Sequence, residues 1–356
     1  MKLHIVVASL LALALSACGG NGSNTASTNS GSGSGSGSSG GTGGTITNCA
    51  IANTHPLVAI ALTGGAGAAQ FSGGGTTLTY SGSLSGRLNL VQDANAPAPL
   101  NKACMDSTGN SSNSMRTVMQ SNGGALGVSH TVVNGADQPA FLMDTTALAS
   151  NTNLGVLQGT YTVLRYQHDT GSTPAQTRMS YATITIDNLG NWSMCKNTST
   201  CSTATATGTF AAHSGSSYAF DLLSGGLVRA TAFMVGAGAN STLVVTENDT
   251  GGGGIVTGIW LGVPQSAWNP VAGSYVLNTS DDIQNPLTAS IQNLIVKTQN
   301  IALTPNTPIT GIATATVSDG TVNYLIASPA GLLVTGNNSG NNFANGPAYF
   351  SFGVMP

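Results

Sequence analysis

The chain has 356 residues, of which 6 % are charged and 48 are glycine, and its formal net charge is −3. Soluble domains usually contain about 25 % charged residues, so neutral polar groups must cover most of this surface. Nucleic-acid binding depends on neutralisation of phosphates by Lys and Arg, and the sequence has no basic cluster, so nucleic acid is excluded as a partner.

The first seventeen residues have the order of a secretory signal peptide. Residues 1–4 include one lysine, residues 5–15 form an uncharged apolar run, and the small residues Ser16 and Ala17 follow. A membrane-spanning helix needs about 20 apolar residues, so this run is too short to stay in the bilayer. The sequence therefore predicts export and cleavage before Cys18.

The residues Leu15-Ser16-Ala17-Cys18 resemble the lipobox of bacterial lipoproteins. The resemblance implies that Cys18 is lipidated and becomes the new N-terminus, and several acyl chains would anchor it durably to a membrane. In that family an Asp directly after the cysteine tends to retain the protein in the inner membrane, whereas here the residue is Gly19. The resemblance therefore implies the outer membrane in a cell that has two. A general secretory signal with a chance cysteine is the alternative.

Residues 18–45 are expected to form a lipidated cysteine followed by a disordered linker. From residue 19 onward this segment consists almost wholly of Gly, Ser, Thr and Asn. It has too few apolar side chains to offset the entropy lost on ordering. A random coil of this length has an end-to-end distance of roughly 30 Å, so the folded body is expected to move near the membrane.

The rest of the chain is expected to be all-β. Thr favours pleated positions, Gly and Asn favour turns, and helix formers are scarce. Residues 182–186 alternate in polarity before the turn-forming residues 187–191, which predicts a hairpin. An Asp-Gly turn at residues 318–320 predicts another. Two short segments, 145–150 and 287–296, are the only helix candidates.

We predict three regions after the linker: an irregular β region at 46–150, a β-meander unit at 151–268 and a second meander unit at 269–356. Gly159-Thr160-Tyr161 is echoed by Gly273-Ser274-Tyr275, and residues 243–251 are echoed by residues 332–340 in the same order. These echoes indicate two antiparallel meander barrels or sandwiches that arose by duplication. A chance match is the alternative. Region 46–150 is either a third, degenerate unit or a wrapping segment.

Four cysteines remain when Cys18 is lipidated, and an even number in an exported chain predicts disulfides. Cys195 and Cys201 are close enough in sequence to close a hairpin tip, which leaves Cys49 to pair with Cys104. A zinc site formed by Cys195, Cys201 and His213 is the alternative, but it lacks CxxC spacing.

The sequence predicts no catalytic residue, no metal and no cofactor. The single glutamate, Glu247, has no adjacent histidine for an HExxH site, and no GxSxG motif occurs. His168-Asp169 lies in a turn-rich stretch where capping of the local backbone is the expected role. Calcium is the remaining alternative, with oxygen ligands from residues 248–251 or 278–282, which do not follow EF-hand spacing.

Five aromatic residues are expected to be core material, with the lining of a sugar or lipid cavity as the alternative; they are Tyr161, Trp192, Trp260, Trp268 and Tyr275. The expected function is a lipid-anchored cell-envelope protein with a non-catalytic binding or surface-structural role. The alternatives are a periplasmic hydrolase and a lipocalin-like carrier of an apolar or glycan ligand. The membrane is the expected partner, and no protein partner is identified.

Overall fold

The computed structural model describes the chain from residue 46 onward, with internal gaps. The described residues are 46–49, 51, 54–94, 96, 98–107, 117–171, 175–198, 201–249, 255–280, 287–292, 295–296, 301–318, 320–337 and 348–356. They belong to one compact unit, Gly44–Pro356. Its elements are β-strands with a few 3-10 turns, which confirms the all-β class. No helix in these residues has the length and apolar character needed to cross a bilayer. The predicted signal peptide, Cys18 and the linker lie outside the described residues.

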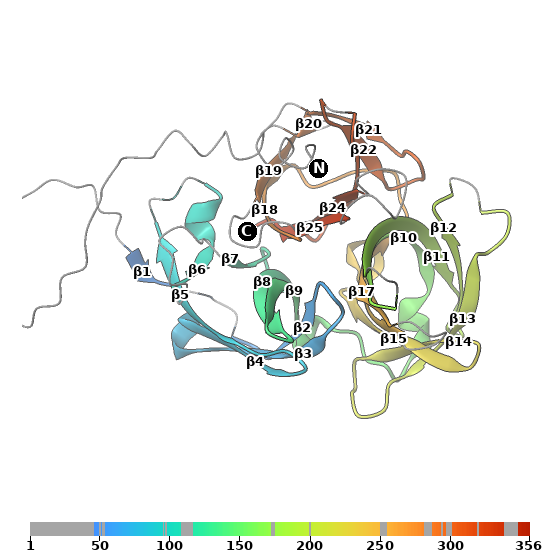
Figure 1. Cartoon of the computed structure of the whole chain (residues 1–356), viewed down its shortest axis with the longest axis horizontal. Coiled ribbons are helices and arrows are strands. Elements are labelled where there is room, and N and C mark those ends of the chain that lie inside the picture. Colours follow the sequence, from blue (N-terminus) through green and yellow to red (C-terminus); the bar gives the residue numbers. More distant parts are fainter. Residues whose placement is uncertain are drawn as a thin grey trace, which may run out of the picture. The chain divides into compact units, whose positions relative to one another are not determined.

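The first part of the unit is a curled nine-stranded sheet. Its strands are β1 (Ile46–Asn48), β2 (Leu57–Ala61), β3 (Ala66–Ser72), β4 (Thr77–Gly82), β5 (Arg87–Asp93), β6 (Cys104–Asp106), β7 (Thr117–Gln120), β8 (Leu126–Val133) and β9 (Ala136–Asp144). β2 pairs with β9 and β5 pairs with β6, so β2 to β9 follow one another around the sheet. β1 is added beside β5 (Figure 1).

The second part is a closed eight-stranded barrel, called here the central barrel. Its strands are β10 (Gly159–Asp169), β11 (Gln176–Ile186), β12 (Asn191–Lys196), β13 (Ala206–Ala212), β14 (Phe220–Ser224), β15 (Leu227–Val235), β16 (Thr242–Asp249) and β17 (Val256–Pro264). Each strand pairs antiparallel with the next, and β10 pairs with β17 to close the ring.

The third part is a second closed barrel, called the C-terminal barrel. Its strands are β18 (Gly273–Thr279), β19 (Leu287–Gln292), β20 (Ile295–Val296), β21 (Ile301–Pro305), β22 (Ala313–Thr316), β23 (Val322–Ser328), β24 (Leu332–Asn337) and β25 (Tyr349–Val354). Both barrels thus have the antiparallel meander order that the sequence predicted. In all three parts the first strand of the meander pairs with the eighth, namely β2 with β9, β10 with β17 and β18 with β25.

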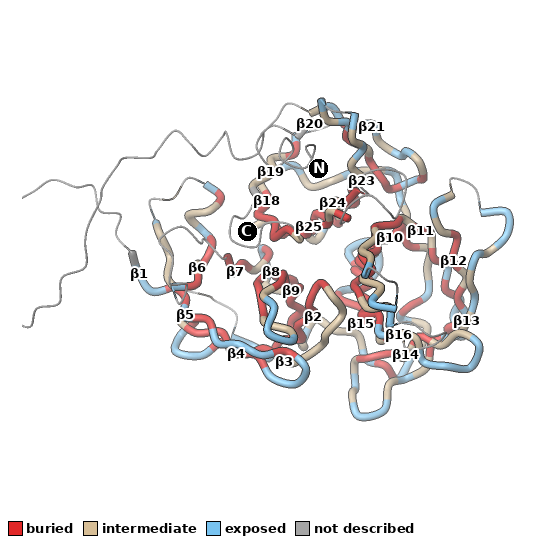
Figure 2. Tube along the Cα trace, viewed as in Figure 1, coloured by how far each residue is buried: buried red, intermediate tan, exposed pale blue. Residues whose placement is uncertain are grey.

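Alternation along each strand separates an inner from an outer face. In β10, Tyr161 and Val163 point into the barrel and belong to its interior core, whereas Leu164 and Tyr166 belong to a second apolar cluster outside it. That second cluster also contains Phe141 of β9 and Phe352 of β25, whose ring centroids lie 5.8 Å apart. Most residues of β10 are therefore buried on both faces (Figure 2).

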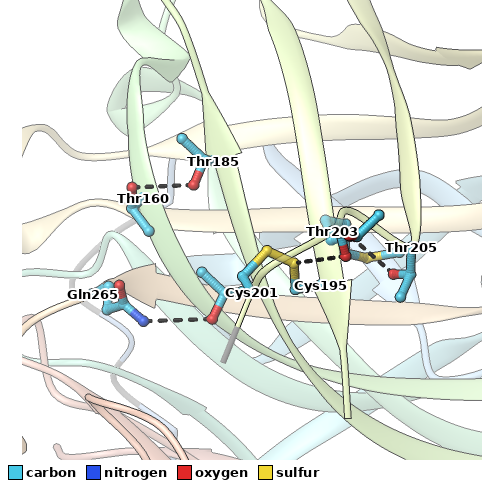
Figure 3. The surroundings of a disulfide bond; sticks show 9 residues. Thr160, Thr185, Cys195, Cys201, Thr203, Thr205 and Gln265 are labelled. Carbon is cyan, nitrogen blue, oxygen red and sulfur yellow. Dashed lines mark hydrogen bonds between the residues drawn. A yellow bond between two sulfur atoms is a disulfide. The ribbon is translucent and has the colours of Figure 1, made fainter. Parts of the chain in front are cut away.

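Both predicted disulfides are present. Cys49 is joined to Cys104, which ties the chain next to β1 to β6. Cys195, near the end of β12, is joined to Cys201 and lies 3.7 Å through Sγ from the carbonyl oxygen of Thr203 (Figure 3). The alternative zinc site is wrong, because both of its cysteines are consumed in this bond.

The two helix candidates contain no α-helix among the described residues. Residues 145–147 form a single 3-10 turn that is capped by Asp144, whose side chain accepts a hydrogen bond from the Thr146 amide. Residues 287–292 form strand β19. The ambiguous periodicity of that segment is resolved by its pairing with β18.

Candidate functional site

One end of the central barrel is polar inside. In β10 the alternation that turns Tyr161 and Val163 inward continues through Arg165 and Gln167. Residues directly opposite one another in an antiparallel pair share a face. Ser180 and Arg178 of β11 lie opposite these two residues and therefore also point inward.

The neighbouring strands add to this polar interior. Lys196 of β12 lies opposite the inward-facing Ala182. On the other side of β10, Trp260 lies opposite Arg165. In β16, Glu247 follows the interior residues Leu243 and Val245 in the same alternation. These inward-facing residues, called here the polar cluster, are Arg165, Gln167, Arg178, Ser180, Lys196, Glu247 and Trp260.

Glu247 is the only glutamate of the chain, and only 7 % of its surface is exposed. One carboxylate oxygen, Oε2, accepts hydrogen bonds from Nε2 of Gln167 at 2.8 Å and from Nε1 of Trp260 at 2.8 Å. The other, Oε1, lies 3.5 Å from Nη2 of Arg165. A buried carboxylate needs such partners, and here they are supplied by β10 and β17.

Gly258 allows the strands that carry this network to approach closely. It lies opposite both Gln167 and Glu247, where β17 passes between β10 and β16. A Cβ atom at this position would clash with the carbonyl oxygen of Tyr166. The close approach of the two backbones therefore requires glycine.

Arg165 is held rigidly and is 5 % exposed. Its guanidinium carbon lies 4.1 Å from the centroid of the Trp260 ring, and its Nη1 atom lies 3.9 Å from Sδ of Met194. Burial lowers the pKa of Arg165, and the adjacent Glu247 carboxylate opposes that shift. An arginine stays protonated in proteins, so the barrel interior contains a fixed positive charge.

Within the polar cluster three side chains are cationic and one is a carboxylate. Arg165, Arg178 and Lys196 are three of the nine Lys and Arg residues of the chain, and Glu247 is the only carboxylate among them. Burial, reinforced by Arg165 and Arg178, lowers the pKa of Lys196 from 10.5 to about 8. The next inward positions are Asp169 and Asp249. Asp169 accepts a hydrogen bond from the Gly171 amide, and Asp249 pairs with Arg229. Neither aspartate contributes to the shift at Lys196.

Two buried polar atoms of the cluster have no hydrogen-bond partner among the described residues: Nε of Arg165 and Oγ of Ser180. The two residues lie directly opposite each other on β10 and β11, and Ser180 is 3 % exposed. An unsatisfied buried polar group costs about 1–3 kcal/mol. Both groups therefore belong to one cross-strand pair of the barrel interior.

The histidines do not build a hydrolase site in the described residues. His55 Nδ1 lies 3.1 Å from Asp144 Oδ2 and 3.4 Å from Thr146 Oγ1. A catalytic triad uses one ring nitrogen for the nucleophile and the other for the acid, whereas here a single nitrogen contacts both. This arrangement instead caps the turn at residues 145–147, because Thr146 Oγ1 also donates to Asp144.

Two other histidines, His130 and His213, have structural partners. His130 is buried in the first sheet, with Nδ1 3.0 Å from Asp137 and Nε2 3.6 Å from Asp106. His213 Nδ1 lies 2.7 Å from Asp221 at a barrel end. His168, considered for a triad with Asp169, is half-buried on β10, and successive side chains of a strand point to opposite faces.

Metal binding finds no support in the part of the chain that the structure describes, where no three His, Cys, Asp or Glu side chains gather as ligands. Asp249, an alternative calcium ligand, is paired with Arg229 at 2.6 Å. Asn278 is buried and donates to the Ser129 carbonyl oxygen at 2.8 Å. Thr250, Gly251, Asp281 and Asp282 lie outside the described residues.

The five aromatic residues occupy the barrels. Tyr161, Trp192 and Trp260 belong to the interior of the central barrel, and Tyr275 belongs to that of the C-terminal barrel, with Trp268 packed against it. Trp260 also takes part in the polar cluster. None of the cluster residues except Trp260 was singled out as a binding residue from sequence. Two features of the sequence could have indicated these residues. Arg165 lies on the same face of its strand as Tyr161, and Glu247 is the single glutamate of the chain.

Comparison with known proteins gives little further information. No family model matches the chain, and no curated protein matches it. A solved structure of a protein of unknown function from the DUF3598 family of Nostoc punctiforme is similar at 11 % sequence identity and a TM-score of 0.19. The match covers 61 % of this chain and 98 % of that chain. At this TM-score the similarity supports no conclusion about fold or function.

Proposed function

We propose that this protein is a lipid-anchored, non-catalytic binding protein of the bacterial cell envelope, and that its central barrel binds a small anionic ligand at the polar cluster. The anchor rests on the lipobox resemblance at Cys18 and on the linker of residues 18–45. Gly19 favours the outer membrane. The apolar or glycan ligand considered from sequence as an alternative is set aside, because Arg165 is buried in the barrel and its Nε needs an acceptor.

The observation that carries the proposal is the buried guanidinium of Arg165, whose Nε has no hydrogen-bond partner among the described residues. Burial of a charge is unfavourable unless it is paired, and the Glu247 carboxylate lies 3.5 Å from Nη2 of the same guanidinium. A bound anion would add a second counter-charge beside Arg165. It would also supply an acceptor to the unpartnered Nε of Arg165.

Binding is proposed in preference to turnover because the polar cluster contains no base beside a nucleophile. The Ser180 hydroxyl is unpartnered among the described residues, and the Glu247 carboxylate is occupied by Gln167 and Trp260. Such a rigid set of donors can hold an anion. It offers no group that is placed to accept a proton from a nucleophile.

The test uses the full-length protein extracted from membranes in mild detergent. Native mass spectrometry would detect a copurified anion, and thermal unfolding would be followed with acetate, phosphate and sulfate at constant ionic strength. We expect at least one anion to raise the unfolding midpoint of the wild type and to have a smaller effect on Lys196→Gln. Arg87→Gln is the control, because Arg87 is exposed on the first sheet. If no anion raises the midpoint and none copurifies, the proposal is wrong.

A further inference from the structure

We infer, on the basis of the binding function proposed above, that the ligand is an organic carboxylate whose two oxygens accept hydrogen bonds from Nε of Arg165 and Oγ of Ser180. This assigns a two-point binding site on adjacent strands of the central barrel. It also names the chemical class of the ligand.

The position of the two donors supports a single small group between them. Arg165 and Ser180 are a cross-strand pair of β10 and β11. The Cβ atoms of such pairs lie about 4.5–5.5 Å apart, so the two side chains start from neighbouring points on the inner wall of the barrel. Both residues are more than nine-tenths buried, and both atoms lack a partner among the described residues.

The chemistry of the unpartnered atoms requires an acceptor. The Nε–H group of arginine can only donate, and a serine hydroxyl can donate to an anion. Arg178 and Lys196, which flank the pair, are also donors. A glycan hydroxyl carries no negative charge, so it would pair less strongly than an anion with the guanidinium of Arg165. An apolar ligand would leave both atoms unsatisfied.

The number of donors favours a carboxylate over phosphate or sulfate. Two donors are unpartnered, and Lys196 at the half-buried side of the cluster can supply a third. A carboxylate has two oxygens, and such a set satisfies it. Phosphate and sulfate have four, and the remaining oxygens would be buried without donors, which is unfavourable. The cluster already stabilises one carboxylate, that of Glu247, beside the same guanidinium.

Arg178 and Lys196 lie at the less buried side of the polar cluster. Arg178 is fixed through Nε, which donates to Oε1 of Gln167 at 3.1 Å. Arg178 and Lys196 are half-buried, whereas Arg165 is buried. Lys196 is thus more accessible to solvent than Arg165, and its positive charge would attract an anion towards the buried guanidinium.

The experiment is isothermal titration calorimetry of the full-length protein in detergent, with butyrate, phosphate, sulfate and glucose as probes at pH 7. We expect butyrate to bind at least tenfold more tightly than phosphate or sulfate and glucose not to bind. The diagnostic variant is Ser180→Ala. It should weaken butyrate binding about tenfold, the effect of one lost hydrogen bond to a charged group. Its unfolding midpoint without ligand should not fall, because the substitution removes an unpartnered hydroxyl.

Ser193→Ala is the matched control, since Ser193 is half-buried on β12 next to the inward-facing Met194 and therefore on the outer face. It should leave butyrate binding unchanged. Equal binding of phosphate and butyrate, or unaltered butyrate binding by Ser180→Ala, would overturn the carboxylate site while leaving the proposed anion-binding function intact. Failure of every anion to bind would overturn both.

Discussion

The guanidinium of Arg165 stacks on the ring of Trp260, with 4.1 Å between Cζ and the ring centroid, and the same indole donates through Nε1 to Glu247. The aromatic ring thus contacts the cation with its face and the carboxylate with its edge. Electrostatics favour both contacts, because the ring face is electron-rich and the indole N–H is a donor. Trp260 therefore contacts both charges of the pair.

Replacement of Trp260 by Phe separates these two contacts. Phe keeps an aromatic face for Arg165 but removes the Nε1 donor, so a buried carboxylate loses one partner. We expect the free energy of unfolding to fall by about 1–3 kcal/mol more than in Trp192→Phe, as measured by urea denaturation. Trp192 is the matched control, since it is buried in the same barrel and its Nε1 has no partner among the described residues. Equal losses in the two variants would show that the Trp260–Glu247 bond contributes nothing.

Lys196 should make stability depend on alkaline pH. Burial and the two arginines lower its pKa from 10.5 to about 8 in the folded protein, so the folded state holds this proton less tightly than the unfolded chain. Below pH 8 Lys196 is charged in both states, and the burial of its charge lowers the free energy of unfolding. As the pH rises from about 8 to 10.5, the folded protein loses this charge first and the free energy of unfolding increases.

The difference between wild type and Lys196→Gln isolates this effect from other titrating groups. Relative to the variant, the wild type should gain on the order of 2 kcal/mol of unfolding free energy across this window, after allowance for solvent screening. Urea denaturation at pH 7.5, 9 and 10.5 would measure it. A constant difference between the two proteins at all three pH values would contradict a lowered pKa.

The two disulfides should differ in their contribution to stability. The Cys49–Cys104 bond closes a separation of 55 residues and Cys195–Cys201 one of 6. In the chain-entropy description a longer loop gives a larger stabilisation, about 4 kcal/mol against about 2 kcal/mol here. Double Cys→Ser variants at each bond, compared by thermal unfolding, should rank in that order. The reverse ranking would mean that native contacts outweigh loop entropy.

Cys18→Ala tests the proposed anchor. Without the thiol no acyl chain can be attached, so the exported protein should move from the membrane fraction to the soluble fraction. Incorporation of labelled palmitate should also be lost. Ser23→Ala, in the linker, is the control and should remain with membranes. If the Cys18→Ala protein stays wholly with membranes, attachment must come from another part of the chain.

Local features of the fold could be predicted from sequence. The hairpin between β11 and β12 depends on Asp187, whose Oδ1 accepts from the amides of Leu189 and Asn191. This chemistry is encoded within five residues and is therefore visible in the sequence. The alternation that produced the all-β prediction is equally local. The first sheet was harder to predict because some strands are very short, such as the three-residue β6.

The polar cluster could not be predicted, because it is created by barrel closure. Arg165 and Trp260 become neighbours only through the pairing of β10 with β17, which brings together positions far apart in the chain. Sequence periodicity indicates that Arg165 shares a face with Tyr161, but it does not indicate which residues lie opposite. Glu247 was considered only as part of a zinc-protease motif. Its partners Gln167 and Trp260 are set by the register in which β17 pairs with β10 and β16.

The pairing of β10 with β17 and of β18 with β25 has a further consequence if the proposed anchor gathers copies of the protein at a membrane. An open sheet presents unpaired amides and carbonyls to its neighbours and can polymerise strand by strand. The two rings keep these groups engaged within one molecule. Such copies would meet no open strand edge on either barrel, whereas β1 of the first sheet pairs only with β5 in the described residues.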